Sequence, residues 1–260
     1  MYSRPMGERT SYPPGTFSWV DLQTSDQDAA KSFYSNLLGW EYDEIPMGDG
    51  ATYSMAKLQD HSVAAIGGVQ DESMPPHWNC YVTVESADAG ADRARELGAT
   101  VLAEPFDVFD AGRMAAFADP QGAVLSVWQP NETIGAGLVN VPGALNWNDL
   151  ITPDLEASAA FYRDLFDWQI EAIPGAEDQY WSIANGGRMN GGMMPMPPGS
   201  HPAWNLYFAV EDVDSAVARA GELGGATIMG PMDIPNGSRF AILRDPQDAV
   251  FSVASGEMDD

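Results

Sequence analysis

The strongest constraint on the fold of this chain is a long internal repeat. The segment FSWVDLQT at 17–24 recurs as LNWNDLIT at 145–152, and WNCYVTVE at 78–85 recurs as WNLYFAVE at 204–211. The two offsets, 128 residues (147 − 19) and 126 residues (204 − 78), are nearly equal. The chain is therefore predicted to contain two copies of one fold, arranged in tandem.

The two copies define the expected domain boundaries. We expect a first domain over 15–129, a linker over 130–142 and a second domain over 143–255. The stretch Pro130–Gly137 within that linker is rich in glycine and lacks apolar periodicity, which is typical of a connection between domains.

Within each copy, the pattern of a strand followed by a helix occurs twice. The expected helices cover 26–38, 86–97, 154–166 and 212–223, and an alternating strand precedes each of them. Asp26 or Ser25 can cap the start of the first helix, and Gly39 stands where its left-handed end would be. Strands outnumber helices about three to one, whereas parallel βα winding needs about one helix per strand. We therefore predict an α+β fold.

Charge and composition exclude several classes of partner. The chain has 38 acidic and 12 basic residues, a net charge of -26, and a field of that sign repels nucleic-acid phosphates and anionic lipid headgroups. No apolar run approaches the roughly 20 residues of a membrane-spanning helix, and the N-terminal segment lacks the apolar stretch of a signal peptide. A single cysteine, Cys80, excludes an intramolecular disulfide. We therefore expect a cytoplasmic protein that binds neither nucleic acid nor membranes.

Four short motifs carry a resemblance to a known family. They are the opening strand, Phe33-Tyr34 ahead of Leu38-Gly39-Trp40, the strand end Val84-Glu85, and the turn Asp119-Pro120-x-Gly122. With them the chain resembles the glyoxalase/bleomycin-resistance/extradiol-dioxygenase superfamily, also called vicinal-oxygen-chelate proteins. It is most similar to the tandem two-domain type labelled antigen, hydroxylase or glyoxalase-like protein. The resemblance implies paired βαβββ modules whose curved mixed sheets enclose one cleft per domain, and it leaves open whether modules pair within a domain or between domains.

The resemblance also indicates where family enzymes hold a divalent metal. Carried onto this sequence, those positions fall on Trp19, Asn79 and Ser126 in the first domain and on Trp147, Asn205 and Ser252 in the second. An indole cannot coordinate a metal, and neutral amide and hydroxyl oxygens are poor ligands for zinc or iron. We therefore expect no metal site and no other cofactor.

Strand alternation extends these positions to a whole sheet face. The first cleft would show Trp19, Asp21, Asn79, Tyr81, Ser126 and Trp128, with Phe17 on the same face as Trp19. The second would show Trp147, Asp149, Asn205, Tyr207 and Ser252, with Met193 or Met194 nearby. Aromatic walls with a few polar groups suit a flat organic ligand held by stacking.

Three classes of function are compatible with this pattern. The first is metal-independent binding of an apolar or aromatic small molecule in the clefts, by a monomer or a homodimer. The second is a glyoxalase-, lyase- or hydroxylase/dioxygenase-like enzyme, in which Asp21 or Asp149 is the general base or a metal site lies elsewhere. The third is a structural scaffold.

Two pairs of residues at matching positions allow a second reading. Asp21 and Asp149 could cap a helix or bond a turn instead of acting on a ligand. Arg113 and Arg239 could anchor an anionic substituent, or they could form surface ion pairs in a chain rich in aspartate.

Overall fold

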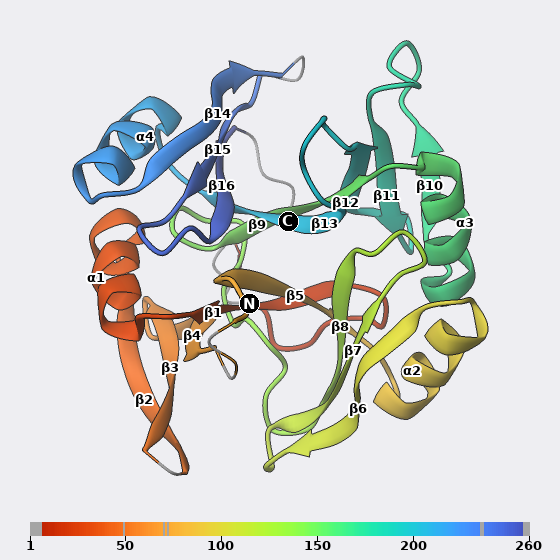
Figure 1. The fold of residues 1–260 in the computed structure, drawn as a ribbon, viewed down its shortest axis with the longest axis horizontal. Coiled ribbons are helices and arrows are strands. Elements are labelled where there is room, and N and C mark those ends of the chain that lie inside the picture. The colour runs from red at the N-terminus through yellow and green to blue at the C-terminus, as the bar shows by residue number, and fades with distance from the viewer. Residues whose placement is uncertain (1–6, 49, 70, 72, 235–236, 257–260) are drawn as a thin grey trace, which may run out of the picture.

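The computed structural model describes residues 7–48, 50–69, 71, 73–234 and 237–256 (Figure 1). The elements of its first half are β1 (Phe17–Thr24), α1 (Gln27–Leu38), β2 (Glu41–Gly48), β3 (Ala51–Leu58), β4 (His61–Gly68), β5 (His77–Thr83), α2 (Ala87–Glu96), β6 (Thr100–Val108), β7 (Gly112–Ala118) and β8 (Val124–Pro130). Those of its second half are β9 (Leu145–Thr152), α3 (Leu155–Phe166), β10 (Gln169–Ala172), β11 (Trp181–Asn185), β12 (Arg188–Pro195), β13 (Ala203–Ala209), α4 (Val213–Glu222), β14 (Ala226–Asp233), β15 (Arg239–Arg244) and β16 (Val250–Ser255). Each half runs twice through a strand, a helix and three strands, which confirms the α+β class and the βαβββ modules. Within the described ranges, none of the helices has the length and apolar character that a membrane crossing needs.

The first helix of each half begins at a capping aspartate. Asp26 and Asp154 each accept a hydrogen bond from the backbone N–H three residues later, at 3.0 Å in both cases. α1 ends at Gly39, whose φ of 78° lies in the left-handed region that glycine adopts most easily. α3 ends in the same way at Asp167, with a φ of 58°. The predicted ends of the first helix, Asp26 and Gly39, are therefore confirmed.

Two eight-stranded sheets organise the chain, one from each half. Their strand orders are β2-β3-β4-β1-β5-β8-β7-β6 and β10-β11-β12-β9-β13-β16-β15-β14. β1 pairs antiparallel with β5 and parallel with β4, while β9 makes the same two pairings with β13 and β12. The two modules of one half therefore share a sheet, so modules pair within a domain. We call β1–β8 domain 1 and β9–β16 domain 2.

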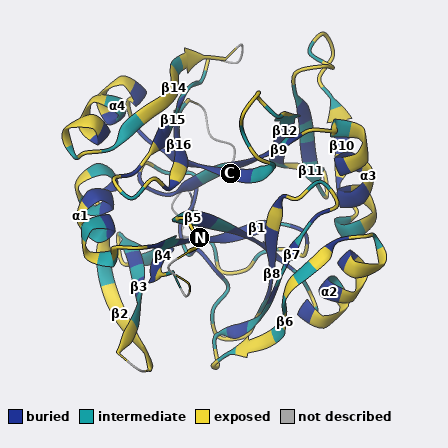
Figure 2. Cartoon of the chain, viewed as in Figure 1, coloured by how far each residue is buried: buried dark blue, intermediate teal, exposed yellow. Residues whose placement is uncertain are grey.

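The two sheets pack back to back. Figure 1 shows the outer strands of each sheet bent away from the other domain, with α1 beside α4 and α2 beside α3. The central strands β5 and β13 lie against each other at the interface of the two sheets. There Cys80 Sγ lies 4.0 Å from the Trp204 carbonyl oxygen and 3.2 Å from Asn148 Nδ2. Figure 2 shows these central strands as largely buried and the outer strands as largely exposed. We call the face of each sheet that points toward the other domain the convex face, and the opposite one the concave face.

A tyrosine–aspartate hydrogen bond crosses between the domains twice. Tyr34 on α1 donates to Asp245 Oδ2 of domain 2 at 3.1 Å, and Tyr162 on α3 donates to Asp119 Oδ2 of domain 1 at 2.9 Å. Each tyrosine hydroxyl also accepts an indole N–H from the central strand of its own domain. Both aspartates begin an Asp-Pro turn, so the motifs that carry the family resemblance also join the two domains.

Two tryptophans repeat this symmetry. Trp40 Nε1 donates to the Gly143 carbonyl, and Trp168 Nε1 donates to the Gly15 carbonyl, both at 2.7 Å. The accepting carbonyls lie just ahead of β9 and β1, the first strand of the other domain in each case. Buried indole N–H groups need such partners, and here the partners come from across the interface.

The edge strand β2 lacks the pattern by which a strand is recognised in a sequence. β2 covers Glu41–Gly48, and nearly all of its side chains are exposed, so it lacks the alternation of buried and exposed residues that identifies a strand.

One predicted side-chain orientation is wrong. Between Phe17 and Trp19 the register with β5 shifts, so that Phe17 lies opposite Val82 whereas Trp19 lies opposite Tyr81. The extra residue of such a bulge turns the preceding side chain to the other face. Phe17 therefore lies on the convex face, with its ring centroid 4.9 Å from that of Trp204.

The crossing hydrogen bonds predict energetic coupling between the domains. Tyr34→Phe leaves a buried Asp245 oxygen without its donor, which costs about 1–3 kcal/mol of the free energy of unfolding. In denaturant unfolding, Tyr34→Phe and Asp245→Asn should be non-additive by roughly 0.5–3 kcal/mol.

The matched control combines Tyr34→Phe with Asp119→Asn, which belongs to the other crossing, and its two effects should add. Additive effects in the Tyr34–Asp245 pair would contradict a crossing bond that stabilises the protein.

Candidate functional site

Each domain buries one aspartate in the middle of its concave face. In domain 1 this is Asp21 on β1, which is 4% exposed. Its Oδ1 accepts a hydrogen bond from Asn79 Nδ2 at 2.8 Å, and its Oδ2 accepts one from each of the Tyr53 and Tyr81 hydroxyls at 3.0 Å. The Trp19 indole N–H donates to the Tyr53 hydroxyl at 3.1 Å. Three donors from β3 and β5 therefore hold the carboxyl group.

Domain 2 repeats the arrangement around Asp149 on β9, which is also 4% exposed. Asp149 Oδ1 accepts from the Tyr180 hydroxyl at 2.7 Å and from Trp147 Nε1 at 2.9 Å. The Tyr207 hydroxyl also acts to lower the pKa of this carboxyl group. Each aspartate is thus surrounded by two tyrosines and a tryptophan of its own domain.

The amides at matching positions differ in their partners. In domain 1, Asn79 donates to the aspartate, whereas Asn205 of domain 2 donates to Ser252 Oγ at 2.8 Å. The place of the amide beside Asp149 is taken by the Trp147 indole. The two networks are therefore related but not identical.

The strand register explains why these side chains meet. Asp21 lies opposite Asn79, Trp19 lies opposite Tyr81, and Tyr81 lies beside Ser126 on β8. The register of domain 2 pairs Asp149 with Asn205, Trp147 with Tyr207, and Tyr207 with Ser252. Paired residues of adjacent strands share a face, so the structure brings these predicted residues together on each concave face.

The structure also decides two further predictions. Trp128 lies on the same face as Ser126, and its indole N–H donates to the Thr133 carbonyl at 2.9 Å. Asp21 and Asp149 accept from side chains of neighbouring strands, so the alternative that they cap a helix or bond a turn is wrong.

The placement of Met193 in the second cleft is wrong. Met193 lies beside Leu150 in the register, whereas Gly192 lies beside Asp149. Neighbouring residues of a strand point to opposite faces, so the fully buried Met193 belongs to the convex face.

Tyr53 and Tyr180 were missed by sequence reasoning. They follow Asp21 and Asp149 by 32 and 31 residues, so a tyrosine recurs at nearly the same place in both copies. Their segments otherwise differ, ATYSMA in one copy and DQYWSI in the other. The repeated tyrosine was therefore the one available signal.

Burial dominates the electrostatics of both aspartates. Loss of solvation raises the pKa of Asp21 and of Asp149, although the hydrogen bonds from Asn79 and the tyrosines act in the opposite direction. Burial, and then the nearby carboxylate, raise the pKa of Tyr53 and of Tyr81 well above its usual range. The tyrosines are therefore held as neutral donors.

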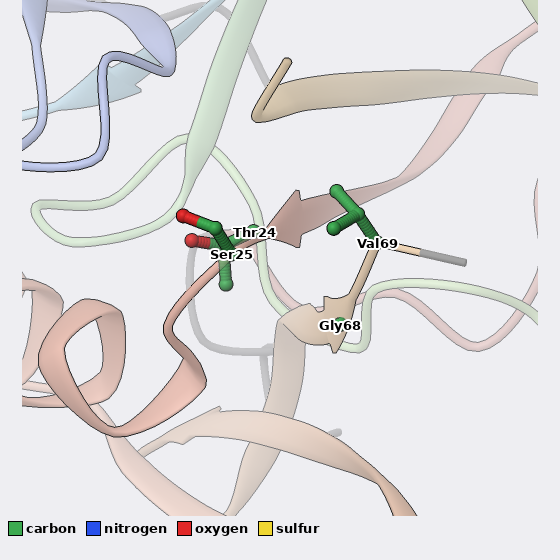
Figure 3. A pocket seen from close by; sticks show the side chains of 4 residues that line it. All are labelled: Thr24, Ser25, Gly68 and Val69. Atoms are coloured by element: carbon green, nitrogen blue, oxygen red, sulfur yellow. The ribbon is translucent and has the colours of Figure 1, made fainter. Parts of the chain in front are cut away.

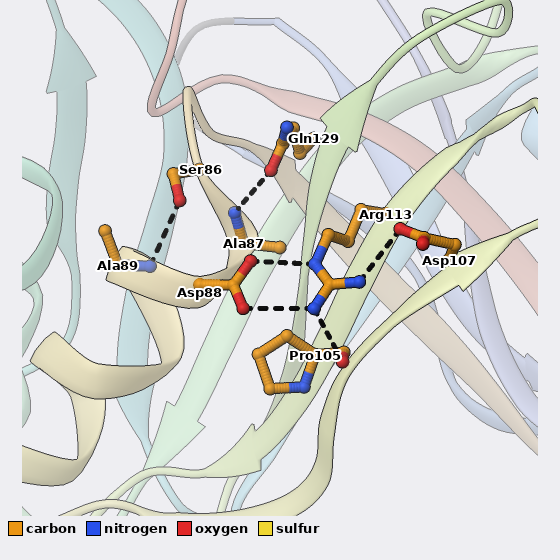
Figure 4. A network of polar contacts seen from close by, with 8 residues as sticks. All are labelled: Ser86, Ala87, Asp88, Ala89, Pro105, Asp107, Arg113 and Gln129. Atoms are coloured by element: carbon orange, nitrogen blue, oxygen red, sulfur yellow. Dashed lines mark hydrogen bonds and ion pairs between the residues drawn. The ribbon is translucent and has the colours of Figure 1, made fainter.

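Arg113 and Arg239 are saturated by carboxylates. The Arg113 guanidinium donates to both oxygens of Asp88 at 2.7 and 3.0 Å, to Asp107 at 2.8 Å and to the Pro105 carbonyl at 3.0 Å (Figure 4). Arg239 makes the equivalent ion pairs with two aspartates of domain 2. The ion-pair interpretation of these arginines is therefore correct, and they are not free to anchor an anion.

Two surface hollows lie away from the aspartate networks. One of about 410 Å³ lies at the carboxyl ends of β1 and β4, lined by Thr24, Ser25, Gly68 and Val69 (Figure 3). The other, of about 290 Å³, lies over β2 and β3, with Tyr42 and Lys57 among its lining residues. Neither is lined by the two buried aspartates, each of which is 4% exposed.

Comparison with protein families gives the same family for both domains. The model of the Glyoxalase/Bleomycin resistance protein/Dioxygenase superfamily matches residues 16–127 and 144–253. The chain belongs to this superfamily.

Curated relatives match over nearly their full length. CFP32 of Mycobacterium tuberculosis, named as a candidate glyoxylase, is 44% identical over 254 residues, covering 95% of this chain and 97% of the relative. The anthracycline biosynthesis protein DnrV of Streptomyces peucetius is 33% identical over 260 residues and covers 94% of both chains.

Solved structures share the fold at low identity. The Mn(II)-bound glyoxalase from Novosphingobium aromaticivorans has a TM-score of 0.66 at 19% identity, covering 95% of this chain and 84% of that one. The halotolerant catechol dioxygenase BphC has a TM-score of 0.65 at 15% identity, with coverages of 95% and 89%.

The side chains on the concave faces do not fit as ligands for the divalent metal that the family resemblance implies. Each face offers one aspartate, and the groups that surround it present O–H and N–H donors to its oxygens. A catalytic zinc or iron takes three or more imidazole, thiolate or carboxylate ligands. The described residues contain no group of three or more His, Cys, Asp or Glu side chains that could supply them.

The raised pKa values of Asp21 and Asp149 predict a pH dependence of stability. A carboxyl group that binds its proton more tightly in the folded state loses stability as pH rises from about 4 through its folded pKa. At acid pH, Asp21→Asn should cost about 1–3 kcal/mol of the free energy of unfolding because hydrogen bonds are lost. That cost should shrink as pH rises, and Asp149→Asn should behave in the same way in denaturant unfolding.

Asp212→Asn is the control of opposite sign. Hydrogen bonds from Ser215 lower the pKa of Asp212 at the start of α4, so its contribution is present at neutral pH and is lost as pH falls. A cost of Asp21→Asn that grows with pH would refute the assignment of a raised pKa.

Proposed function

We propose that this protein binds a planar aromatic small molecule on the concave faces of its sheets, without a metal. The observation that carries the proposal is a buried aspartate among tyrosine and indole donors on the concave face of both domains. Such a surface offers stacking area and a few directed hydrogen bonds, which suit a flat ring system with hydroxyl or carbonyl substituents.

The rims of the concave faces support this proposal. In domain 1, Phe106 on β6 lies opposite Met114 on β7, and in domain 2 Met232 on β14 lies opposite Phe240 on β15. Phe106 and Met232 are 46% and 47% exposed. A phenylalanine–methionine pair at the same place in both domains provides apolar surface that adapts to different ligands.

The names of two relatives also support an aromatic ligand. DnrV and DauV, both 33% identical to this chain, are named for the biosynthesis of anthracyclines, which are polycyclic aromatic compounds. The ligand class we propose for this chain is therefore a hydroxylated polycyclic aromatic compound.

A second candidate function is acid–base catalysis by Asp21 or Asp149. It is favoured by the raised pKa of these buried carboxyl groups and by the glyoxylase name of CFP32. Turnover of a glutathione hemithioacetal that is lost in Asp21→Asn or Asp149→Asn would favour this candidate over binding alone.

The proposal predicts a metal-independent complex with a dihydroxyanthraquinone. We expect a Kd on the order of 10 μM, about -7 kcal/mol, from quenching of tryptophan fluorescence in the presence of a chelator. The non-planar adamantanol should bind much more weakly.

Rim variants separate the proposed site from nonspecific adsorption. Phe106→Ser combined with Met232→Ser should weaken binding about tenfold through loss of apolar contact. Met74→Ser, at a loop residue that is 45% exposed, should leave the affinity unchanged. Equal effects of the rim and loop variants, or no binding at all, would refute the proposal.

A further inference from the structure

The hydroxyl of Tyr180 fills a small recess against β12. It donates to Asp149 Oδ1 at 2.7 Å and accepts from Trp147 Nε1 at 3.0 Å. The recess exists because residue 192 is a glycine. A Cβ atom at Gly192 would lie 1.8 Å from the Tyr180 hydroxyl and 2.6 Å from Asp149 Oδ1.

Domain 1 lacks this recess. The residue beside Asp21 in the register is Ala65, at the place that Gly192 occupies beside Asp149. Tyr53 reaches Asp21 from within β3, where it is paired with Ile45 on one side and with Gly67 on the other. A shift of the backbone at Tyr53 would therefore disturb two strand ladders.

Tyr180 is held in a different way. It precedes β11, at the end of a connection over 173–180 in which most residues are exposed. Its backbone bonds are local: its N–H donates to the Ala176 carbonyl at 2.9 Å, and its carbonyl accepts from the Ile173 N–H at 3.1 Å. A rotation of its side chain, or a shift of this connection, therefore leaves the strand pairs of the sheet in place.

We propose that the Tyr180 phenol occupies a subsite for the aryl hydroxyl of a ligand in domain 2, and that the ligand binds by displacing it. The inference rests on the proposed function of the concave face. A ligand phenol that replaces Tyr180 can donate to Asp149 Oδ1 and accept from the Trp147 indole, so the exchange conserves both hydrogen bonds. It also accounts for the burial of Asp149, because the chain supplies its own occupant of the subsite.

The test uses phenol as the probe and the variant Tyr180→Ala, in which the subsite is empty. Phenol should bind this variant about tenfold or more tightly than the wild type, because in the wild type the subsite is available only when Tyr180 has withdrawn. Calorimetric titration and the rise in melting temperature with phenol measure this gain, and toluene, which lacks the hydroxyl, should produce much less.

Two variants test the geometry. Gly192→Ala added to Tyr180→Ala should abolish the gain, because the methyl group fills the recess. Trp147→Phe added to Tyr180→Ala should reduce the gain, because the indole that donates to the phenol oxygen is removed. A gain that Trp147→Phe leaves unchanged, or one that survives Gly192→Ala, would overturn the inference.

A conservative variant covers the case in which Tyr180→Ala does not fold. Tyr180→Phe keeps the ring but removes both hydrogen bonds, so phenol should displace it more easily than it displaces tyrosine. Unchanged phenol affinity in Tyr180→Phe would count against displacement.

The failure of this inference can be told apart from that of the proposed function. If a dihydroxyanthraquinone binds the wild type and Gly192→Ala equally well, the proposed function stands and the subsite is wrong. If phenol fills the Tyr180→Ala subsite but no polycyclic aromatic binds the wild type, the subsite is right and the proposed function is wrong.

Discussion

The rest of the structure depends on one constraint, the antiparallel pairing between the first strands of two modules. These pairs are β1 with β5 and β9 with β13. This pairing joins two βαβββ modules into one sheet and sets opposite each other the residues that surround the buried aspartate. A shift of one residue would move these side chains to the other face. The same pairing also orients Trp78 and Trp204 toward the interdomain core, so one register determines both faces.

The two faces have opposite chemical roles. The space between the convex faces holds large aromatic side chains with few polar atoms, and some of these atoms are satisfied across the interface, as in Tyr34 of α1 with Asp245. The concave faces carry a carboxyl group that is deprived of water, and its oxygens are satisfied by neutral donors and not by a cation. Desolvation of such a group is unfavourable unless its hydrogen bonds are made, which accounts for the tyrosines around Asp21 and Asp149.

Much of this architecture could be predicted from the sequence, because a repeat in register identifies the modules and alternation identifies one face of each central strand. Residue pairs such as Asp21 and Asn79 followed from that alternation. Tyr53 and Tyr180 did not, because they come from outer segments that approach the aspartate only when the sheet bends. Phe17 was misplaced because a bulge leaves no mark in the pattern, and Met193 was misplaced because a run of methionines and glycines does not reveal which residue lies beside Asp149. The hydrogen-bond partners of Tyr34 and Tyr162 lie in the other copy of the repeat, and local sequence patterns carry no information about them.

The central claim is that both aspartates are held by hydroxyl and N–H donors and not by a metal ion. Elemental mass spectrometry of the protein, purified without a chelator or a histidine tag, tests this claim most directly. We predict zinc, iron, nickel and manganese well below one equivalent per chain. One equivalent or more of any of these metals, lost in Asp21→Asn or Asp149→Asn, would contradict it.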